Sequence, residues 1–317
     1  MEKVRFGKTN MMVTPLTFGT WGIGGAGWDD NSDETRLDAI AAAVESGINF
    51  IDTAPAYNAG RAERYIGQAL EAMGKGTREK IHIATKCANA FVDGQYVRSG
   101  KADLIYQQCE ESLRNLRTDY IDLMIVHWPD PNVPYEETFG ALTRLKEEGV
   151  IRHIGVSNFN REQLEQALQA ADVEAVQLQF SMVDLDNVDE LKWAHDLDLG
   201  TMTYGSLGGG ILTGRYRTLQ SYETMDNRSR FYPYFREPLF SRAMKLLDVM
   251  ETIADARGVP LSQVAINWSR QQPYVDTSIF GAQRRDRVES NAACLTWDLT
   301  PEEIQLLDSG VSEFALT

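Results

Sequence analysis

The 317-residue chain contains only three cysteines, at positions 87, 109 and 294. Cysteines this few and this far apart provide neither a disulfide framework nor the paired spacing of a metal site. We therefore predict three buried free thiols, no bound metal and a cytoplasmic location. Cys87 is of most interest among them because it follows a candidate catalytic lysine.

The chain also lacks long apolar segments. No stretch reaches the about 18 consecutive apolar residues that a membrane-spanning helix requires. The first residues carry charges at Glu2, Lys3, Arg5 and Lys8, without the apolar segment that is typical of a signal peptide. We expect a protein without a membrane partner.

Basic residues are in the minority, with 31 Lys and Arg against 46 Asp and Glu, which gives a formal net charge of -15. Phosphate backbones bind through clustered Lys and Arg, so a nucleic-acid partner is disfavoured. The hydrophobic fraction of 43% and the charged fraction of 24% are ordinary for a globular protein. Because the length fits one α/β barrel, we predict a single domain over residues 1–317.

Short apolar segments alternate with amphipathic ones along most of the chain. The expected strands are residues 16–19, 49–52, 81–85, 121–126, 151–156, 175–178, 201–203 and 277–279. The expected helices are residues 34–46, 62–73, 103–116, 136–148, 161–170, 188–196, 262–271 and 285–292. This alternation is typical of βαβ units, and eight such units predict an α/β fold of the (β/α)8 TIM-barrel type.

Three segments are expected to lie outside the eight units. Residues 1–14 alternate weakly around Val4 and Phe6, which indicates an N-terminal hairpin covering the bottom of the barrel. Thr300, Pro301 and Glu303 form a capping-box pattern, which predicts an extra C-terminal helix. Residues 215–238 contain two prolines and little periodicity, so we expect a long loop there with a functional role.

Polar side chains stand where several expected strands end. Asp52 ends the second strand with Tyr57 in the loop after it, Lys86 follows the third strand and His127 the fourth. The carboxyl ends of barrel strands carry catalytic residues, so these four should meet on one rim. Each residue alone is commonly structural, as a turn, packing or solvated side chain.

The four side chains together supply what carbonyl reduction requires. A tyrosine with its usual pKa of about 10 is a weak proton donor at neutral pH. We expect the ammonium of Lys86 to lower the pKa of Tyr57, and the carboxylate of Asp52 to hold that ammonium in place. His127 is expected to donate a hydrogen bond to the substrate oxygen.

Four motifs resemble those of the aldo-keto reductase family, in the same order and at matching intervals. They are D-T-A-P-A-Y at 52–57, T-K at 85–86, H-W-P at 127–129 and I-G-V-S-N-F at 154–159. The resemblance extends over nearly the whole chain. It implies a (β/α)8 barrel in which Tyr57 is the general acid and base, Lys86 and Asp52 tune it, and His127 orients the carbonyl.

The resemblance also implies a nicotinamide cofactor bound without a Rossmann domain. In the family a Ser, an Asn and a Gln bind the carboxamide, and a Tyr stacks on the ring. A glycine-rich segment, here 205–214, resembles the pyrophosphate loop, and residues 281–291 resemble the adenosine-phosphate site. The cofactor contacts that this implies are Gly19, Thr20, Trp21, Ser157, Asn158, Gln179, Tyr204, Gly205, Ser206, Leu207, Gly208, Gly210, Arg215, Gly281, Gln283, Arg284, Arg287 and Asn291.

The sequence departs from the family pattern at the adenosine end. Gln283 stands where many members place a Ser or Thr on the 2'-phosphate, and Ser290 replaces an acidic residue that commonly meets the adenine. Arginines 284, 285 and 287 begin a helix, where a bound phosphate would offset their repulsion by the helix dipole. We therefore predict NADPH, and NADH is kept as the alternative.

The expected substrate is a small aldehyde, ketone, sugar or alcohol between aromatic side chains, with Trp21 and Trp128 as substrate contacts. Neither its identity nor the oligomeric state follows from the sequence. Two alternatives remain. One is a cofactor-binding regulatory protein with slow turnover, and the other is a barrel lyase that forms a Schiff base on Lys86.

Overall fold

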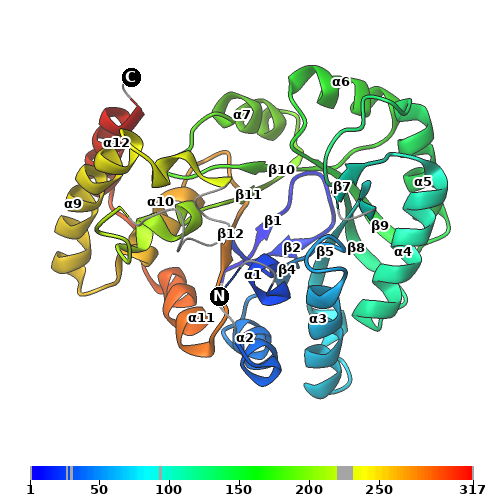
Figure 1. Cartoon of the computed structure of the whole chain (residues 1–317), viewed down its shortest axis with the longest axis horizontal. Coiled ribbons are helices and arrows are strands. Elements are labelled where there is room, and N and C mark those ends of the chain that lie inside the picture. Colours follow the sequence, from blue (N-terminus) through cyan, green and yellow to red (C-terminus); the bar gives the residue numbers. More distant parts are fainter. Residues whose placement is uncertain (1, 26–27, 29–30, 93–94, 220–230, 316–317) are drawn as a thin grey trace.

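The computed structural model describes residues 2–25, 28, 31–92, 95–219 and 231–315. Eight parallel strands form a closed barrel, as the sequence predicts (Figure 1). In chain order they are β3 (Leu16–Gly19), β4 (Phe50–Asp52), β5 (His82–Cys87), β8 (Ile121–Val126), β9 (Ile151–Ser157), β10 (Ala175–Gln179), β11 (Gly200–Tyr204) and β12 (Thr277–Gly281). β3, β4 and β8 are buried along their whole length, and each of the other five strands has a single residue that is not buried, as apolar strands covered on both faces require.

Helices surround the barrel in the order that βαβ connections produce (Figure 1). They are α2 (Asp33–Glu45), α3 (Arg61–Ala72), α4 (Ala102–Leu116), α5 (Tyr135–Glu147), α6 (Arg161–Ala170), α7 (Val188–Asp196), α10 (Leu261–Arg270) and α11 (Arg285–Ala292). Each begins and ends within about two residues of the predicted helix, and side-chain caps mark the start of α2 and α6. Asn160, for example, caps α6 in a reciprocal pair with Gln163.

The two predicted additions to the barrel are present. β1 (Val4–Arg5) and β2 (Met12–Val13) pair as an antiparallel hairpin, and Phe6 packs edge-on against Phe50 at the start of β4, with ring centroids 5.5 Å apart. The hairpin therefore closes the amino-terminal end of the barrel. At the other end of the chain, α12 (Pro301–Ala315) begins at the predicted capping box, where the Thr300 amide donates to Glu303 at 2.8 Å.

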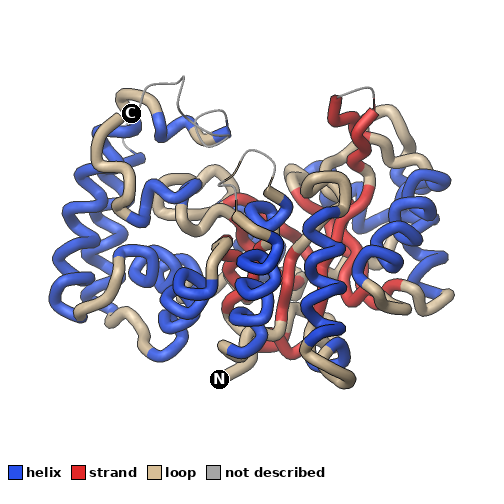
Figure 2. The backbone as a smooth tube through the Cα atoms, turned by 60° about the horizontal axis from the view of Figure 1, so that its bottom comes forward, coloured by secondary structure: helices blue, strands red, loops and turns tan. Residues whose placement is uncertain are grey.

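The sequence interpretation missed several elements. α9 (Leu239–Arg257) is a 19-residue helix that packs against α12 outside the ring (Figure 1). β6 (Asn89–Val92) and β7 (Gln95–Arg98) form a hairpin that projects beyond the barrel rim (Figure 2). A one-turn helix, α1 (Trp21–Gly24), follows β3 directly. Short 3-10 turns complete the description at η1 (Arg78–Lys80), η2 (Gly208–Thr213), η4 (Pro233–Phe235) and η5 (Ala293–Thr296).

The prediction of a long loop at residues 215–238 is partly wrong, because η4 lies inside that segment. Residues 220–230 lie outside the described part of the chain.

Cys87, Cys109 and Cys294 are buried as predicted, and burial raises the pKa of Cys109 to about 12. Among the described residues no cluster of His, Cys, Asp and Glu is arranged to hold a metal. None of the described helices combines the length and apolarity needed to cross a bilayer.

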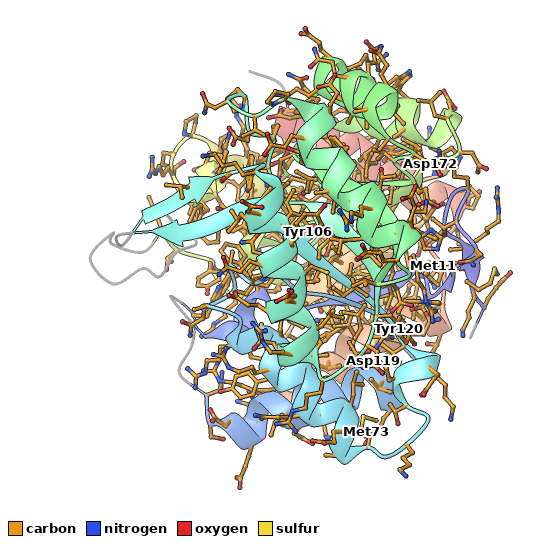
Figure 3. The ribbon with its side chains drawn as sticks, turned by 90° about the vertical axis from the view of Figure 1, so that its right-hand side faces the viewer. Met11, Met73, Tyr106, Asp119, Tyr120 and Asp172 are labelled. Atoms are coloured by element: carbon orange, nitrogen blue, oxygen red, sulfur yellow. The ribbon has the colours of Figure 1, made fainter. Side chains whose placement is uncertain are left out.

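The amino-terminal rim of the barrel carries ion pairs with a structural role. Tyr120, labelled in Figure 3, lies between the guanidinium groups of Arg78 and Arg152, at 4.0 and 3.7 Å from the ring centroid. Arg78 also pairs with the buried Asp122 at 2.8 Å. This rim is thus occupied by packing interactions, which leaves the opposite rim for chemistry.

Candidate active site

The four predicted catalytic residues meet at the carboxyl-terminal rim, three of them at hydrogen-bond distance. The Lys86 Nζ donates to both carboxylate oxygens of Asp52, at 2.7 and 2.6 Å, and to the Tyr57 hydroxyl at 3.2 Å. A fourth bond runs from this Nζ to the Thr53 carbonyl at 2.9 Å. Strand register explains the meeting, because Asp52 pairs with Ala84 and Lys86 lies two residues further along β5.

A left-handed turn directs the phenol of Tyr57 towards Lys86. The three residues after it, Asn58, Ala59 and Gly60, have φ angles of 56°, 50° and 71°. Non-glycine residues rarely adopt this conformation, and consecutive examples are retained where surrounding contacts hold them. Here the Gly60 amide donates to the Pro55 carbonyl at 2.7 Å, which closes the turn.

Two buried side chains that the sequence interpretation missed support this group. Gln177 donates to Asp52 Oδ1 at 2.7 Å, so that carboxylate is bound from two sides. Glu63 lies behind the barrel wall, where it accepts from the Thr85 hydroxyl at 2.7 Å and from Asn115 at 3.0 Å. Alternation along β10 could have identified Gln177, because it is two residues before Gln179 and shares its face.

The predicted direction of the Tyr57 pKa is wrong. Burial in the protein, followed by the negative charge of Asp52, raises the pKa of Tyr57 well above its usual value. Lys86 does not reverse this effect, because its ammonium is already matched by a carboxylate at 2.6 Å. The hydroxyl is therefore protonated through the neutral pH range, which is the state that an acid needs before it donates.

His127 stands beside the phenol as a neutral ring. Its imidazole lies edge-on to Tyr57, with ring centroids 6.2 Å apart and an interplanar angle of 83°. Burial, followed by the positive charge of Lys86, lowers the pKa of His127 well below its usual value. A neutral imidazole carries one N–H, so His127 is able to donate one hydrogen bond without adding a charge to the site.

A cavity of about 1540 Å³ opens from these residues. Most of the predicted cofactor contacts line it: Gly19, Thr20, Trp21, Ser157, Gln179, Tyr204, Gly205, Ser206, Leu207, Gly210, Arg215, Gly281, Gln283, Arg284, Arg287 and Asn291. Asp52, Tyr57, His127 and Trp128 are also in the lining. The lining does not include Lys86, which lies behind Tyr57 and Asp52.

Two predicted cofactor contacts, Asn158 and Gly208, are not in that lining among the described residues. The Asn158 amide, directly after β9, instead connects the ends of β8 and β11: it donates to the His127 carbonyl at 2.9 Å and accepts from the Tyr204 hydroxyl at 2.8 Å. Asn158 has a φ of 62°, a conformation that asparagine tolerates better than most residues. It thereby fixes the ring of Tyr204, which does face the cavity.

The glycine-rich segment after β11 forms a loop that only glycine fits. Gly208, Gly209 and Gly210 have φ angles of 55°, 60° and 101°. A Cβ on Gly209 would lie 2.5 Å from the Tyr232 ring, so the aromatic side chain packs directly on the backbone. Gly209 and Gly210 line the cavity, and backbone exposed by glycine suits an anion. Gly209 and Tyr232 were not predicted as site residues.

The arginines at the start of α11 have different environments. Arg284 and Arg287 line the cavity. Arg285 does not, because it pairs with Asp38 at 2.6 Å and with Glu45 at 2.6 Å on the outer surface of α2. The third arginine of the sequence pattern is thus part of helix packing.

Aromatic side chains surround the mouth of the cavity above Tyr57. Trp21 lies nearly parallel to Tyr57, with ring centroids 6.4 Å apart, and its other contacts are with Trp28 at 5.0 Å and Phe231 at 5.7 Å. Trp128 also lines the cavity, and the Arg98 guanidinium lies 4.7 Å from its ring centroid. Trp28 and Phe231 escaped the sequence interpretation, because single aromatics in loops carry no periodic signal.

Comparison with known proteins agrees with this geometry. The family model described as "Aldo/keto reductase family" matches residues 15–311. The chain is 34% identical to "Aldo-keto reductase YhdN" of Bacillus subtilis (strain 168), over 96% of this chain and 91% of that protein. The chain therefore belongs to the aldo-keto reductase family.

Other similar proteins differ in the substrate or cofactor that their names state. The "NADH-specific methylglyoxal reductase" of Escherichia coli (strain K12) is 29% identical, over 97% of each protein. Among solved structures, the glycerol dehydrogenase AKR11B4 from Gluconobacter oxydans superposes with a TM-score of 0.89 at 31% identity, covering 99% of this chain and 96% of that one. An aldo/keto reductase from Klebsiella pneumoniae, in complex with NADP and acetate, has a TM-score of 0.75 at 28% identity, covering 97% and 94%.

Proposed function

We propose that the protein is an NAD(P)H-dependent oxidoreductase that reduces a small aldehyde, ketone or sugar carbonyl, or oxidises the corresponding alcohol, with Tyr57 as general acid and base. The observation that carries this proposal is the 3.2 Å contact between the Tyr57 hydroxyl and the Lys86 Nζ at the edge of a large cavity. We further propose that residues 1–317 act as one cytoplasmic barrel domain.

The cavity suits a dinucleotide. The charged side chains in its described lining are Arg215, Arg284, Arg287 and Asp52, and the last of these is neutralised by Lys86. A protein with a net charge of -15 thus has a cationic cavity, which favours an anion such as a pyrophosphate. The glycine loop after β11 lines the same cavity as these arginines. A reduced nicotinamide, when bound, would supply the hydride.

The protein side chains supply the proton and the orientation. The protonated Tyr57 hydroxyl donates its proton to the oxygen of the carbonyl as negative charge develops there. Lys86 donates to the phenol oxygen, so it stabilises the phenolate that remains. Asp52 keeps Lys86 charged, and neutral His127 donates a hydrogen bond to the same substrate oxygen.

We favour NADPH as the cofactor, because Arg284 and Arg287 both face the cavity. Arginine pairs well with a 2'-phosphate, which NADH lacks. The Gln283 amide is bound on both sides by other protein groups, so it supplies less to a phosphate than the family's Ser or Thr would. One relative is NADH-specific and one structural relative holds NADP, so the preference is specific to each member.

A Schiff base on Lys86 is disfavoured by the geometry. The amine donates to Asp52, Thr53 and Tyr57, and it lies behind the cavity wall. An ammonium held in this way has no free lone pair to attack a carbonyl.

Absorbance at 340 nm tests the proposed function. We expect a panel of aromatic, aliphatic and sugar aldehydes to be reduced with loss of reduced nicotinamide, and kcat/KM to be at least about tenfold higher with NADPH than with NADH. The double substitution Arg284→Ser and Arg287→Ser should remove that preference while NADH kinetics stay within about twofold. Absence of turnover with either nucleotide across the panel would contradict the proposal.

A further inference from the structure

Three consecutive backbone carbonyls of α1 are each held by a side chain from a different part of the barrel. Gln283, after β12, donates to the Gly22 carbonyl at 2.7 Å. Arg36, on α2, donates to the Ile23 carbonyl at 2.7 Å. Asn58, in the turn after Tyr57, donates to the Gly24 carbonyl at 2.8 Å. The Gly22 carbonyl also accepts from the Gly25 amide at 3.2 Å. A one-turn helix cannot satisfy all of its last carbonyls internally, and the three side chains supply bonds that the helix lacks.

The sequence of this segment, W-G-I-G-G, is adapted to the three contacts. A Cβ on Gly22 would lie 3.2 Å from the Gln283 amide nitrogen, and a Cβ on Gly24 would lie 3.0 Å from the Tyr57 carbonyl oxygen. A Cβ on Gly25 would lie 2.5 Å from the Arg36 guanidinium, and Gly25 also has a φ of 91°. Glycine is therefore required where Gln283, the Tyr57 turn and Arg36 approach the backbone of this segment.

The three side chains differ in burial and in the part of the site that they contact. Arg36 is only 2% exposed, and it also donates to the Asn31 carbonyl at 3.0 Å. Gln283 lies in the part of the cavity with Arg284 and Arg287, whereas Asn58 lies next to Tyr57. α1 thus connects the expected cofactor end of the cavity to the substrate end.

The residue carried by α1 at its first position is Trp21. Its indole faces Tyr57 at 6.4 Å with an interplanar angle of 29°, and it forms one wall of the space where a carbonyl would meet the phenol. A shift of α1 would move that wall relative to the acid.

We propose that Gln283, Arg36 and Asn58 are positioning residues that hold α1 at three points. They thereby fix Trp21 as a wall of the substrate space, and a change at either the cofactor end or the substrate end of the cavity would shift Trp21 through α1. This proposal rests on the proposed function for its substrate. None of the three residues is assigned a chemical step.

The test compares Asn58→Gly with Ala59→Gly. Both positions are left-handed, and Ala59 has no side-chain bond to α1, so the second variant controls for backbone freedom. With an aromatic aldehyde that contacts Trp21, we expect Asn58→Gly to raise KM about five- to tenfold with kcat within about twofold, the worth of about one hydrogen bond. KM for a three-carbon aldehyde should change less than about twofold in Asn58→Gly. Ala59→Gly alters the same turn without removing a bond to α1, so it should leave the ratio of the two KM values as in the wild type.

Gln283→Ala supplies the second half of a double-mutant cycle. Gln283 and Asn58 both bind α1, so their effects on the aromatic substrate should be coupled: the double variant should resemble the worse single variant. A KM increase equal to the product of the two single increases would overturn the proposal.

Hydrogen–deuterium exchange of the peptide that covers residues 20–25 provides a readout without catalysis. We expect faster exchange in Asn58→Gly and Gln283→Ala, and unchanged exchange in Ala59→Gly. Equal exchange in all variants would overturn the three-point support even if the enzyme is active. Conversely, a wild-type protein without carbonyl turnover but with these exchange changes would refute the proposed function alone.

Discussion

Replacement of Tyr57 with phenylalanine is expected to lower kcat for carbonyl reduction by roughly 10²–10⁴-fold, the usual contribution of a positioned general acid. The ring remains to fill the space beside Trp21 and His127, so the cavity keeps its shape. The affinity for NADPH, measured by fluorescence titration or calorimetry, should change less than about threefold, because the hydroxyl bonds to Lys86.

Two outcomes would contradict the role assigned to Tyr57. One is a variant whose single-turnover rate constant is more than about a tenth of the wild-type value. Product release does not limit the rate in that experiment. The other is a loss of cofactor affinity as large as the loss of turnover, which would make the residue a binding group rather than an acid.

The substitution Lys86→Met should affect both activity and stability. The side chains of Lys86 and Asp52 are only 1% and 4% exposed, so removal of the lysine leaves a buried carboxylate without its cation. Breaking such a pair typically costs about 3–5 kcal/mol in the free energy of unfolding. We expect urea denaturation to show that loss, and kcat to fall by at least about 10²-fold, because no ammonium stabilises the phenolate.

The double substitution Asp52→Asn with Lys86→Met separates these two effects. Replacing both members of a buried ion pair with neutral groups often restores stability. The double variant should therefore recover most of the unfolding free energy while kcat stays low. Recovery of turnover together with stability would show that Lys86 acts only in folding.

The sequence was sufficient for the barrel because the fold depends on local patterns. Alternating strands and helices, the Asn160 cap and the Thr300 capping box each encode one unit, and strand ends on a closed parallel barrel converge on one rim. That convergence is why Asp52, Tyr57 and Lys86 were predicted to meet.

What the sequence could not show depends on contacts between distant loops. The Tyr57 pKa was predicted in the wrong direction, because the sequence suggested a Lys86 charge but not how fully Asp52 would balance it or how deeply the phenol is enclosed. Arg285 was grouped with its neighbours, yet a salt bridge to α2 removes it from the cavity. The support of α1 joins residues 22 and 283, which no local pattern relates.

The most direct test of hydride transfer at this site uses a deuterium-labelled cofactor. NADPH that carries deuterium at both C4 positions of the nicotinamide is incubated with the enzyme and an aldehyde, and the alcohol is analysed by mass spectrometry. The account predicts one deuterium bound to the former carbonyl carbon, and none when Tyr57→Phe is stopped at the same early time. An alcohol that carries only solvent hydrogen on that carbon would contradict hydride transfer and with it the assignment of the site.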